Sequence, residues 1–358
     1  MRIKKALFLG TLCTAVSGMS LFAQAGVSYA KSAEKTTEAA SSEEAESEEE
    51  TSEEVTYPIT IEHAFGETVI ESKPERIATI GWENQDTPLA LGVAPVGVSA
   101  ANYGMVTDNN LHPWTDEAFA DLGVEKPVVF DDVDGLDFEQ ISDCNPDVIL
   151  AAYSGMTQED YDTLSQIAPV IPYKEKAWQT SWREQTIENA EGMGMKPEGE
   201  KKVKEVEDLI AEKLEEYPQL EGIPTAFCWI SADDFSTFYV YLPTDPRAAY
   251  LLDLGLTLTE SVQKLAGETD DFNITVSREN ADQLDDIQLM VVYGDEDLLK
   301  SLQEDKLMSQ IPAIKNGAVA LVDSTSALAG ASTPSILSIP YEIDEYLQLL
   351  SDVAENIK

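Results

Sequence analysis

The stretch that decides the fold is RIATIGWENQDTPLALGVAPVGV, residues 76–98. It predicts a buried strand, a short turn, an amphipathic helix and a second strand, which is the opening unit of many α/β proteins that bind phosphate on a glycine-rich loop. Here the turn holds Gly81, Trp82 and Glu83 in place of a run of glycines. The unit therefore predicts an α/β fold with a flat apolar face where a phosphate would otherwise sit.

Two internal repeats indicate a second lobe of the same kind. LDFEQISDCNPDVILAAYSG (136–155) and TVSRENADQLDDIQLMVVYGD (275–295) both read as a helix start, a turn and a buried strand. The counterpart of the opening stretch is TAFCWISADDFSTFYVYLPTDPRAAYLLDLGLTL (225–258), which predicts a strand, a loop and a helix. Strands that alternate with helices predict two Rossmann-like α/β lobes with mostly parallel sheets.

One long helix is expected to join the lobes, at residues 191–218. Apolar residues recur there at helical spacing, and Glu and Lys fill the other face. We place an N-terminal lobe at 56–190 and a C-terminal lobe at 219–358, with the ligand cleft between them. A single helical connection predicts little movement of one lobe against the other. Ahead of the first lobe, ITIEHAFGETVIE (59–71) predicts a hairpin.

The first 30 residues predict an export signal. A basic start, MRIKK, precedes an apolar stretch and small residues suited to cleavage near Ala25 or Ala30. The alternatives are an uncleaved membrane anchor and a lipid on Cys13, although Leu12 departs from a lipobox. Residues 31–55 hold ten glutamates and no aromatic residue, which predicts a disordered acidic tether. We expect an extracytoplasmic protein, periplasmic or at the cell surface.

The charge and the motifs exclude several functions. The chain has 23 basic and 67 acidic residues, a formal net charge of −44, so nucleic acid, whose phosphates need cations, is excluded as a partner. With only His63 and His112, no metal site built on several histidines is expected. Phosphate-binding glycine motifs and a G-x-S-x-G nucleophile motif are absent from the sequence. We therefore predict a binding protein, not an enzyme, with no cofactor.

Two arginines occupy matching positions in the two lobes. Arg183 in SWRE and Arg247 in TDPRAAYLL each fall at the second position of an expected helix. A cation there opposes the helix dipole by about 0.3–1 kcal/mol. An anionic ligand would compensate that cost. The alternative is a pair of salt bridges within a very acidic protein.

Aromatic residues gather at the carboxyl ends of the expected strands, where open α/β sheets bind ligands. Core packing is the alternative for any one of them. The candidate ligand-binding residues are Trp82, Tyr103, Tyr153, Trp178, Trp182, Arg183, Tyr239, Tyr241, Arg247 and Tyr293. A broad aromatic cleft suits a large flat or globular ligand.

Two glutamates also occupy matching places. Asp137 and Ser277 are plausible helix caps, which puts Glu139 and Glu279 at second helical positions. Helix starts favour acidic residues in any protein, and that is the simpler interpretation. The functional interpretation is a pair of acidic side chains on one outer face that dock on a two-fold symmetric basic partner.

The chain from about residue 56 onward resembles the iron-siderophore substrate-binding proteins of ABC importers, of the single-helix-linked class that includes cobalamin- and haem-binding proteins. The carrying segments are HAFGETVIESKPERIATIGW, LALGVAPVGV, FDDVDGLDFEQISDCNPDVILAAYSGMTQEDYDTLSQIAPV, TSWRE and TVSRENADQL. The resemblance implies two α/β lobes, a ferric-siderophore cleft, and docking of Glu139 and Glu279 on arginines of a permease dimer that works with an ATPase. The iron would arrive already coordinated, so no metal ligand from the protein is expected.

We predict a monomer that captures a ferric siderophore and delivers it to an ABC importer. The siderophore class stays open. A trianionic catecholate would need Arg183 and Arg247, joined by Lys174 or Lys176, whereas a hydroxamate would depend on the aromatic residues. Two arginines among many aromatic residues also fit a carboxylate-bearing or a mixed ligand. The rivals are a corrinoid or haem carrier on the same fold, an exported hydrolase and a surface adhesion module. Cys144 and Cys228 are expected to be buried apolar residues without a disulfide role.

Overall fold

The computed structural model describes residues 55–132 and 135–358. The expected signal, Cys13 and nearly all of the expected tether lie outside these ranges. The hairpin is confirmed as β1 (Ile59–His63) and β2 (Gly66–Ile70), which pair antiparallel with His63 opposite Gly66. Among the described residues, no helix is long and apolar enough to cross a bilayer.

The first lobe is built on a five-stranded sheet in the order β5-β4-β3-β6-β7, with every pair parallel. Its strands are β3 (Ile77–Thr79), β4 (Gly97–Ser99), β5 (Val129–Phe130), β6 (Val148–Ala151) and β7 (Val170–Pro172). Its helices are α1 (Asp86–Ala90), α2 (Pro113–Asp121), α3 (Phe138–Asp143), α4 (Gln158–Leu164) and α5 (Trp182–Gly192). The central strands are buried along their whole length, as expected for a sheet covered on both faces.

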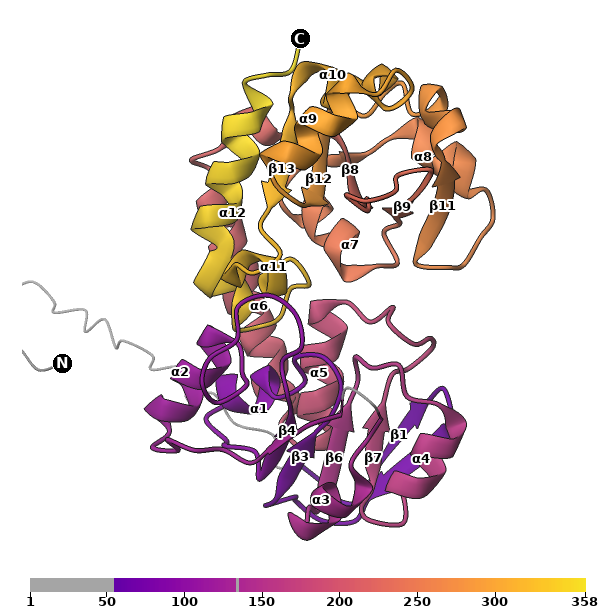
Figure 1. The fold of residues 1–358 in the computed structure, drawn as a ribbon. Helices are drawn as coiled ribbons and strands as arrows, with labels where there is room; N and C mark the ends of the chain where they lie inside the picture. The colour runs from indigo at the N-terminus through magenta and orange to yellow at the C-terminus, as the bar shows by residue number, and fades with distance from the viewer. Residues whose placement is uncertain (1–54, 133–134) are drawn as a thin grey trace, which may run out of the picture. The chain divides into compact units, whose positions relative to one another are not determined.

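The opening stretch of the sequence forms β3, a turn, α1 and β4 in the expected order (Figure 1). The expectation that its helix is amphipathic is wrong, because Asp86, Thr87, Pro88 and Leu89 are all buried. The physical reason is tertiary: α5 packs against α1, and Ser335 from the far end of the chain donates a hydrogen bond to Asp86. A helix enclosed in this way has only its last residue, Ala90, partly exposed to solvent.

The second lobe is built on a sheet in the order β11-β9-β8-β12-β13, with β10 also paired to β8. Its strands are β8 (Pro224–Trp229), β9 (Thr237–Tyr241), β10 (Thr257–Leu258), β11 (Asn273–Ser277), β12 (Leu289–Tyr293) and β13 (Val319–Val322). β8, β12 and β13 run parallel, whereas β9 is antiparallel to both of its neighbours. The sheet thus has a parallel centre and an antiparallel edge.

Helices and short 3-10 turns complete the second lobe. They are η1 (Pro218–Leu220), α7 (Pro246–Asp253), α8 (Glu260–Ala266), η2 (Arg278–Gln283), α9 (Glu296–Glu304), η3 (Met308–Gln310), α10 (Pro312–Asn316), α11 (Ala327–Ala331) and α12 (Ser338–Ala354). Val291 and Met290 of β12 belong to separate apolar clusters, because successive side chains of a strand point to opposite faces. Both faces of this sheet are therefore covered.

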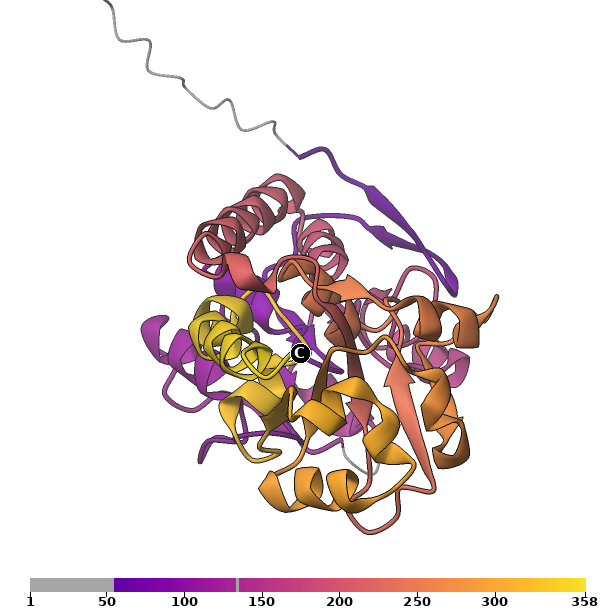
Figure 2. The same ribbon diagram turned by 90° about the horizontal axis from the view of Figure 1, so that it is seen from above.

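The helix that joins the lobes is α6 (Lys196–Leu214), shorter at both ends than the expected range. Its apolar stripe is confirmed: Val203, Val206 and Ile210 are buried in the core cluster of the second lobe. α12 packs beside α6 in both views (Figures 1 and 2). The connection is thus a pair of packed helices.

A second contact between the lobes involves the segment around α11. The backbone N–H of Met105 donates to the carbonyl of Ser326 at 2.9 Å. Gly330 lies so close to the ring of His112 that a Cβ at this position would come within 2.7 Å of it. Together with the bond between Ser335 and Asp86, these contacts tie the two lobes at a place distant in sequence from α6.

Candidate ligand-binding site

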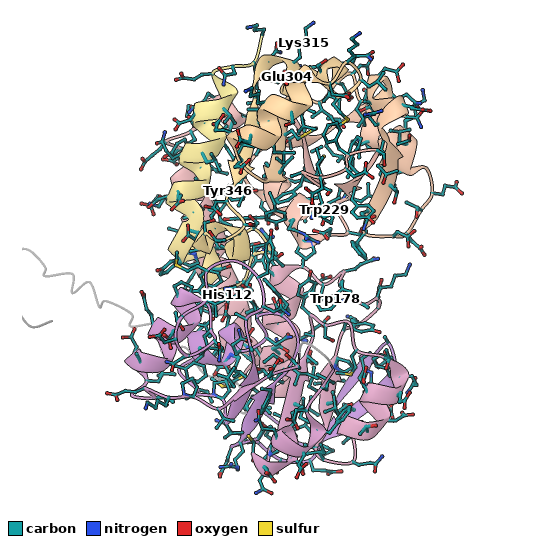
Figure 3. The ribbon with its side chains drawn as sticks, viewed as in Figure 1. His112, Trp178, Trp229, Glu304, Lys315 and Tyr346 are labelled. Carbon is teal, nitrogen blue, oxygen red and sulfur yellow. The ribbon has the colours of Figure 1, made fainter. Side chains whose placement is uncertain are left out.

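A cavity of about 390 Å³ lies between the lobes and is lined by residues of both. Its lining residues are Trp82, Tyr103, Tyr153, Trp178, Trp229, Tyr241, Arg247, Phe272, Tyr293 and Thr333. Figure 3 shows Trp178 and Trp229 on facing sides of the space between the lobes. Eight of the ten lining residues are aromatic, which makes the cavity a place for a large ligand with apolar surface.

Trp82 is held by a turn that only the observed residues allow. Its backbone N–H donates to the carbonyl of Tyr153 at 3.1 Å. Gly81 has φ of 80°, and a Cβ on it would lie 2.7 Å from that same carbonyl, so glycine is required. The buried Asn84 bonds to Tyr153 through both its amide nitrogen and its oxygen. The turn that replaces a phosphate loop is therefore fastened to the neighbouring strand.

Trp178 is the most constrained aromatic residue of the site. Its backbone has φ of 62°, an uncommon conformation for a bulky residue, and its N–H donates to Ser154 at 3.2 Å. Its ring meets Tyr153 edge-on at 5.3 Å between centroids. It also lies against Gly155, where a Cβ would come within 2.5 Å of the indole nitrogen. Strain of this kind is maintained where the surroundings determine one geometry.

Of the residues that the structure describes, Arg247 alone brings a positive charge to the lining of the cavity. It stands at the second position of α7, as predicted, and Asp245 caps that helix. The Asp245 carboxylate also accepts from Nε of Arg247 at 2.8 Å and from Nη2 at 2.6 Å, and the guanidinium lies 3.9 Å from the ring centroid of Tyr241. Burial alone would lower the pKa of Arg247, but the bonds to Asp245 outweigh it and raise that pKa. The arginine is therefore permanently charged and already paired.

The tyrosines of the cavity are neutral at physiological pH. Burial raises the pKa of Tyr103 to about 12 and raises the pKa values of Tyr153, Tyr241 and Tyr293 in the same direction. Tyr103 and Tyr293 meet edge-on at 5.2 Å. Arg247 is the one charged side chain among the described lining residues, and the adjacent Asp245 balances it.

Three of the candidate residues do not line the cavity. Trp182 is only 2% exposed and donates from its indole to Asp253 at 3.0 Å. Arg183 pairs with the same Asp253 at 2.7 Å and with Glu207 at 2.6 Å, which is the salt-bridge alternative. Tyr239 stacks on Trp229 at 5.5 Å, so it lies beside the site without lining it.

Lys174 and Lys176, the other candidate cations, are also absent from the lining of the cavity. Lys176 pairs with Asp270, a surface ion pair between the lobes. Such exposed pairs contribute little to stability, about 0–1 kcal/mol.

Three lining residues, Trp229, Phe272 and Thr333, were not among the candidates. Trp229 is the last residue of β8, so the rule that selected Tyr153 and Tyr293 at strand ends would also have selected it. Phe272 and Thr333 come from segments between elements, where no spacing in the sequence marks them. Only the chain path brings them to the cavity.

A buried acidic cluster lies behind Trp82. Glu83 is 3% exposed, and its Oε1 lies 3.7 Å from Nε2 of His112. Burial, aided by the charge of Asp86, raises the pKa of Glu83; burial lowers the pKa of His112 to about 4. Burial also raises the pKa of Asp86 to about 6, against hydrogen bonds from Ser335, Thr115 and Trp114. The ring of His112 lies 5.4 Å from that of Trp82 between centroids, so this buried cluster packs against a wall of the cavity.

The two expected docking glutamates are both exposed at helix starts. Asp137 accepts from Gln140 and caps α3, and Ser277 accepts from the N–H of Glu279 and caps η2. Glu139 and Glu279 therefore both stand at the second position of their elements, as the spacing predicted. Both side chains are exposed, and their docking on a partner stays a prediction.

Two α/β lobes, a joining helix and an aromatic cavity between the lobes define a two-lobed substrate-binding protein. The chain belongs to the periplasmic binding protein family, which matches residues 77–325. The family resemblance and the two-lobed α/β fold expected from the sequence are thereby confirmed.

Three known proteins illustrate the similarity. PiaA of Streptococcus pneumoniae TIGR4, solved in complex with ferrichrome, is 47% identical, with a TM-score of 0.81 over 84% of this chain and 100% of that chain. The petrobactin-binding protein YclQ of Bacillus subtilis is 24% identical over 305 residues, 81% of this chain and 88% of the relative. Staphylococcus aureus SirA, complexed with staphyloferrin B, shares the fold at 23% identity and a TM-score of 0.63 over 84% of this chain and 99% of that chain.

Proposed function

We propose that this protein captures a ferric hydroxamate siderophore outside the cytoplasm and delivers it to an ABC importer. The observation that carries the proposal is the cavity between the lobes, whose described lining is mostly aromatic and whose lining cation, Arg247, is already paired with Asp245. The family is one of substrate-binding proteins, and PiaA, at 47% identity, was solved with ferrichrome.

The charge of the ligand decides the siderophore class. Three hydroxamate groups, each with one negative charge, neutralise Fe³⁺, and the complex is neutral. Three catecholates, each with two negative charges, leave a trianion. A trianion in this cavity would find no unpaired cation among the lining residues, and burial of an unpaired charge is costly. Burial of a neutral complex carries no such cost, and contact with the aromatic rings stabilises it.

Delivery requires contact with a membrane partner. We assign that contact to Glu139 and Glu279, which are exposed, capped alike and placed one on each lobe. Their expected partners are arginines of a permease dimer that works with an ATPase. We further propose that the protein is a monomer, that residues 1–30 export it, and that it performs no reaction on its ligand.

The test is isothermal titration calorimetry of the exported protein with ferrichrome, with a ferric tris-catecholate and with haemin. We expect tight binding of ferrichrome and at least tenfold weaker binding of the tris-catecholate. Tight binding of the tris-catecholate alone would contradict the hydroxamate assignment. A Soret band with haemin and no heat with ferrichrome would replace the siderophore by haem.

A further inference from the structure

A second cavity of about 300 Å³ adjoins the ligand cavity in the first lobe. The two cavities share Trp82 and Trp178 as walls. The rest of the second lining comes from segments at the carboxyl ends of the first sheet and from α4, and it includes Gly81, Ser99, Asp132, Gly155 and Asp160. A ligand that fills the aromatic cavity therefore has a neighbouring space into which a side arm can extend.

Trp178 forms the partition between the two cavities. Its strained backbone and its close fit against Gly155 hold the indole in this place. Trp178 therefore presents its indole as a fixed wall to both cavities.

The second cavity differs from the first in charge. Its only ionisable side chains among the described residues are two carboxylates, Asp132 and Asp160, and no Lys or Arg lines it. Asp160 is partly engaged, because one of its oxygens accepts from the N–H and hydroxyl of Thr157 in the cap of α4. Asp132 accepts from the hydroxyl of Ser99, which in turn accepts from the N–H of Gly81 at 3.0 Å.

The Asp132 carboxylate is half-buried in the wall of the second cavity. Burial raises its pKa, and the charge of Asp131 acts in the same direction; hydrogen bonds from Ser99 and from the backbone oppose them. A carboxylate can accept about four hydrogen bonds, so a donor on a ligand can bind it beside Ser99. A cationic donor would supply both hydrogen bonds and charge.

We propose that this second cavity is a subsite for a protonated amine carried on a side arm of the ferric hydroxamate. The proposal rests on the proposed function and adds the chemical class of the ligand's side arm. An ammonium group next to Asp132 forms a charge-assisted hydrogen bond, whereas an amide leaves the carboxylate charge unbalanced. A carboxylate arm would be repelled by both aspartates.

The experiment compares three ferric complexes that share one linear tris-hydroxamate scaffold. The first ends in a primary amine, the second is its N-acetyl derivative and the third is its N-succinyl derivative. We expect calorimetry to rank them in that order, with about tenfold between the amine and the acetyl derivative, which corresponds to about 1.4 kcal/mol. In Asp132→Asn, which keeps an acceptor for Ser99, we expect the acetyl and amine forms to bind equally.

The matched control is Asp131→Asn. Asp131 carries the same charge and precedes Asp132 in the chain, but its side chain does not line the cavity. It should keep the preference for the amine. Equal loss of preference in both variants would show a general field effect and overturn the subsite. Equal binding of all three complexes to the wild-type protein would also overturn it while leaving the proposed function intact, whereas failure of all three to bind would count against the proposed function itself.

Discussion

Arg247 and Asp245 form a two-point ion pair inside the cleft, with Nε to Oδ1 at 2.8 Å and Nη2 to Oδ2 at 2.6 Å. Asp245 is fully buried and also caps α7, so the same carboxylate offsets the unfavourable cation in the first turn. This pairing, which is internal to the protein, replaces the anionic ligand as the compensation for that cation. It neutralises the charge of Arg247 in the aromatic cavity.

Breaking this pair should destabilise the protein. Arg247→Met leaves the buried Asp245 charge unpaired, and we expect the free energy of unfolding to fall by up to about 3 kcal/mol. The double variant Asp245→Asn with Arg247→Met should recover part of the loss, because no lone charge remains. Urea unfolding of the single and double variants measures this coupling. Additive losses would show that the two side chains do not depend on each other.

Trp82 should contribute to affinity and Trp182 to stability. Trp82→Ala removes a cavity wall, and we expect a loss of about 10–100-fold in affinity for ferrichrome with little change in the unfolding midpoint. Trp182→Ala leaves a cavity in the core, and it should lower the unfolding midpoint more than it lowers the affinity for ferrichrome. Calorimetry and thermal unfolding of both variants separate the two roles. The reverse result would make Trp82 a structural residue.

Glu188 should make the protein less stable as the pH rises. Burial, and then the charge of Glu184, raises its pKa from an ordinary value of 4.5 to about 8. The protonated form is thus favoured in the folded state, and its contribution is complete below pH 4.5 and is lost as the pH rises through about 8. Each pH unit between these values is worth at most about 1.4 kcal/mol.

We therefore expect Glu188→Gln to match the wild type near pH 4.5 and to be more stable than it at pH 8. Urea unfolding at both pH values measures the difference. Glu200→Gln, an exposed change on α6, is the control and should show no such divergence. Equal stability of Glu188→Gln and wild type at pH 8 would contradict the raised pKa.

Glu139 and Glu279 should act in transport without acting in ligand binding. The double variant Glu139→Ala with Glu279→Ala should lose most of the ligand-dependent stimulation of the importer's ATPase in proteoliposomes, because both lobes lose a contact. Affinity for ferrichrome should not change. Glu159→Ala is a matched control, since Glu159 is also exposed at the second position of a capped helix, α4. Equal loss in the control would point to general surface charge.

Much of the architecture could be read from the sequence, because it depends on local spacing. Val203, Val206 and Ile210 recur at helical spacing and are buried in α6 as that spacing predicts. The caps at Asp137 and Asp245 act as their residue types predict, since an N-cap bond spans only two or three residues. The segments that carry the family resemblance and the two repeated units are likewise set by local sequence patterns.

The tertiary structure alone decided which side chains meet. Arg183 and Arg247 look alike in sequence, yet Arg183 is neutralised at Glu207 and Asp253, and Arg247 faces the cavity beside Tyr241. Phe272 and Thr333 reach the cavity through the path of the chain, without any periodic signal. Composition and spacing determined a two-lobed α/β binding protein, because they set which faces are buried. The charge balance of its cleft was decided by contacts between distant segments, because pairing depends on positions in space that no local pattern encodes.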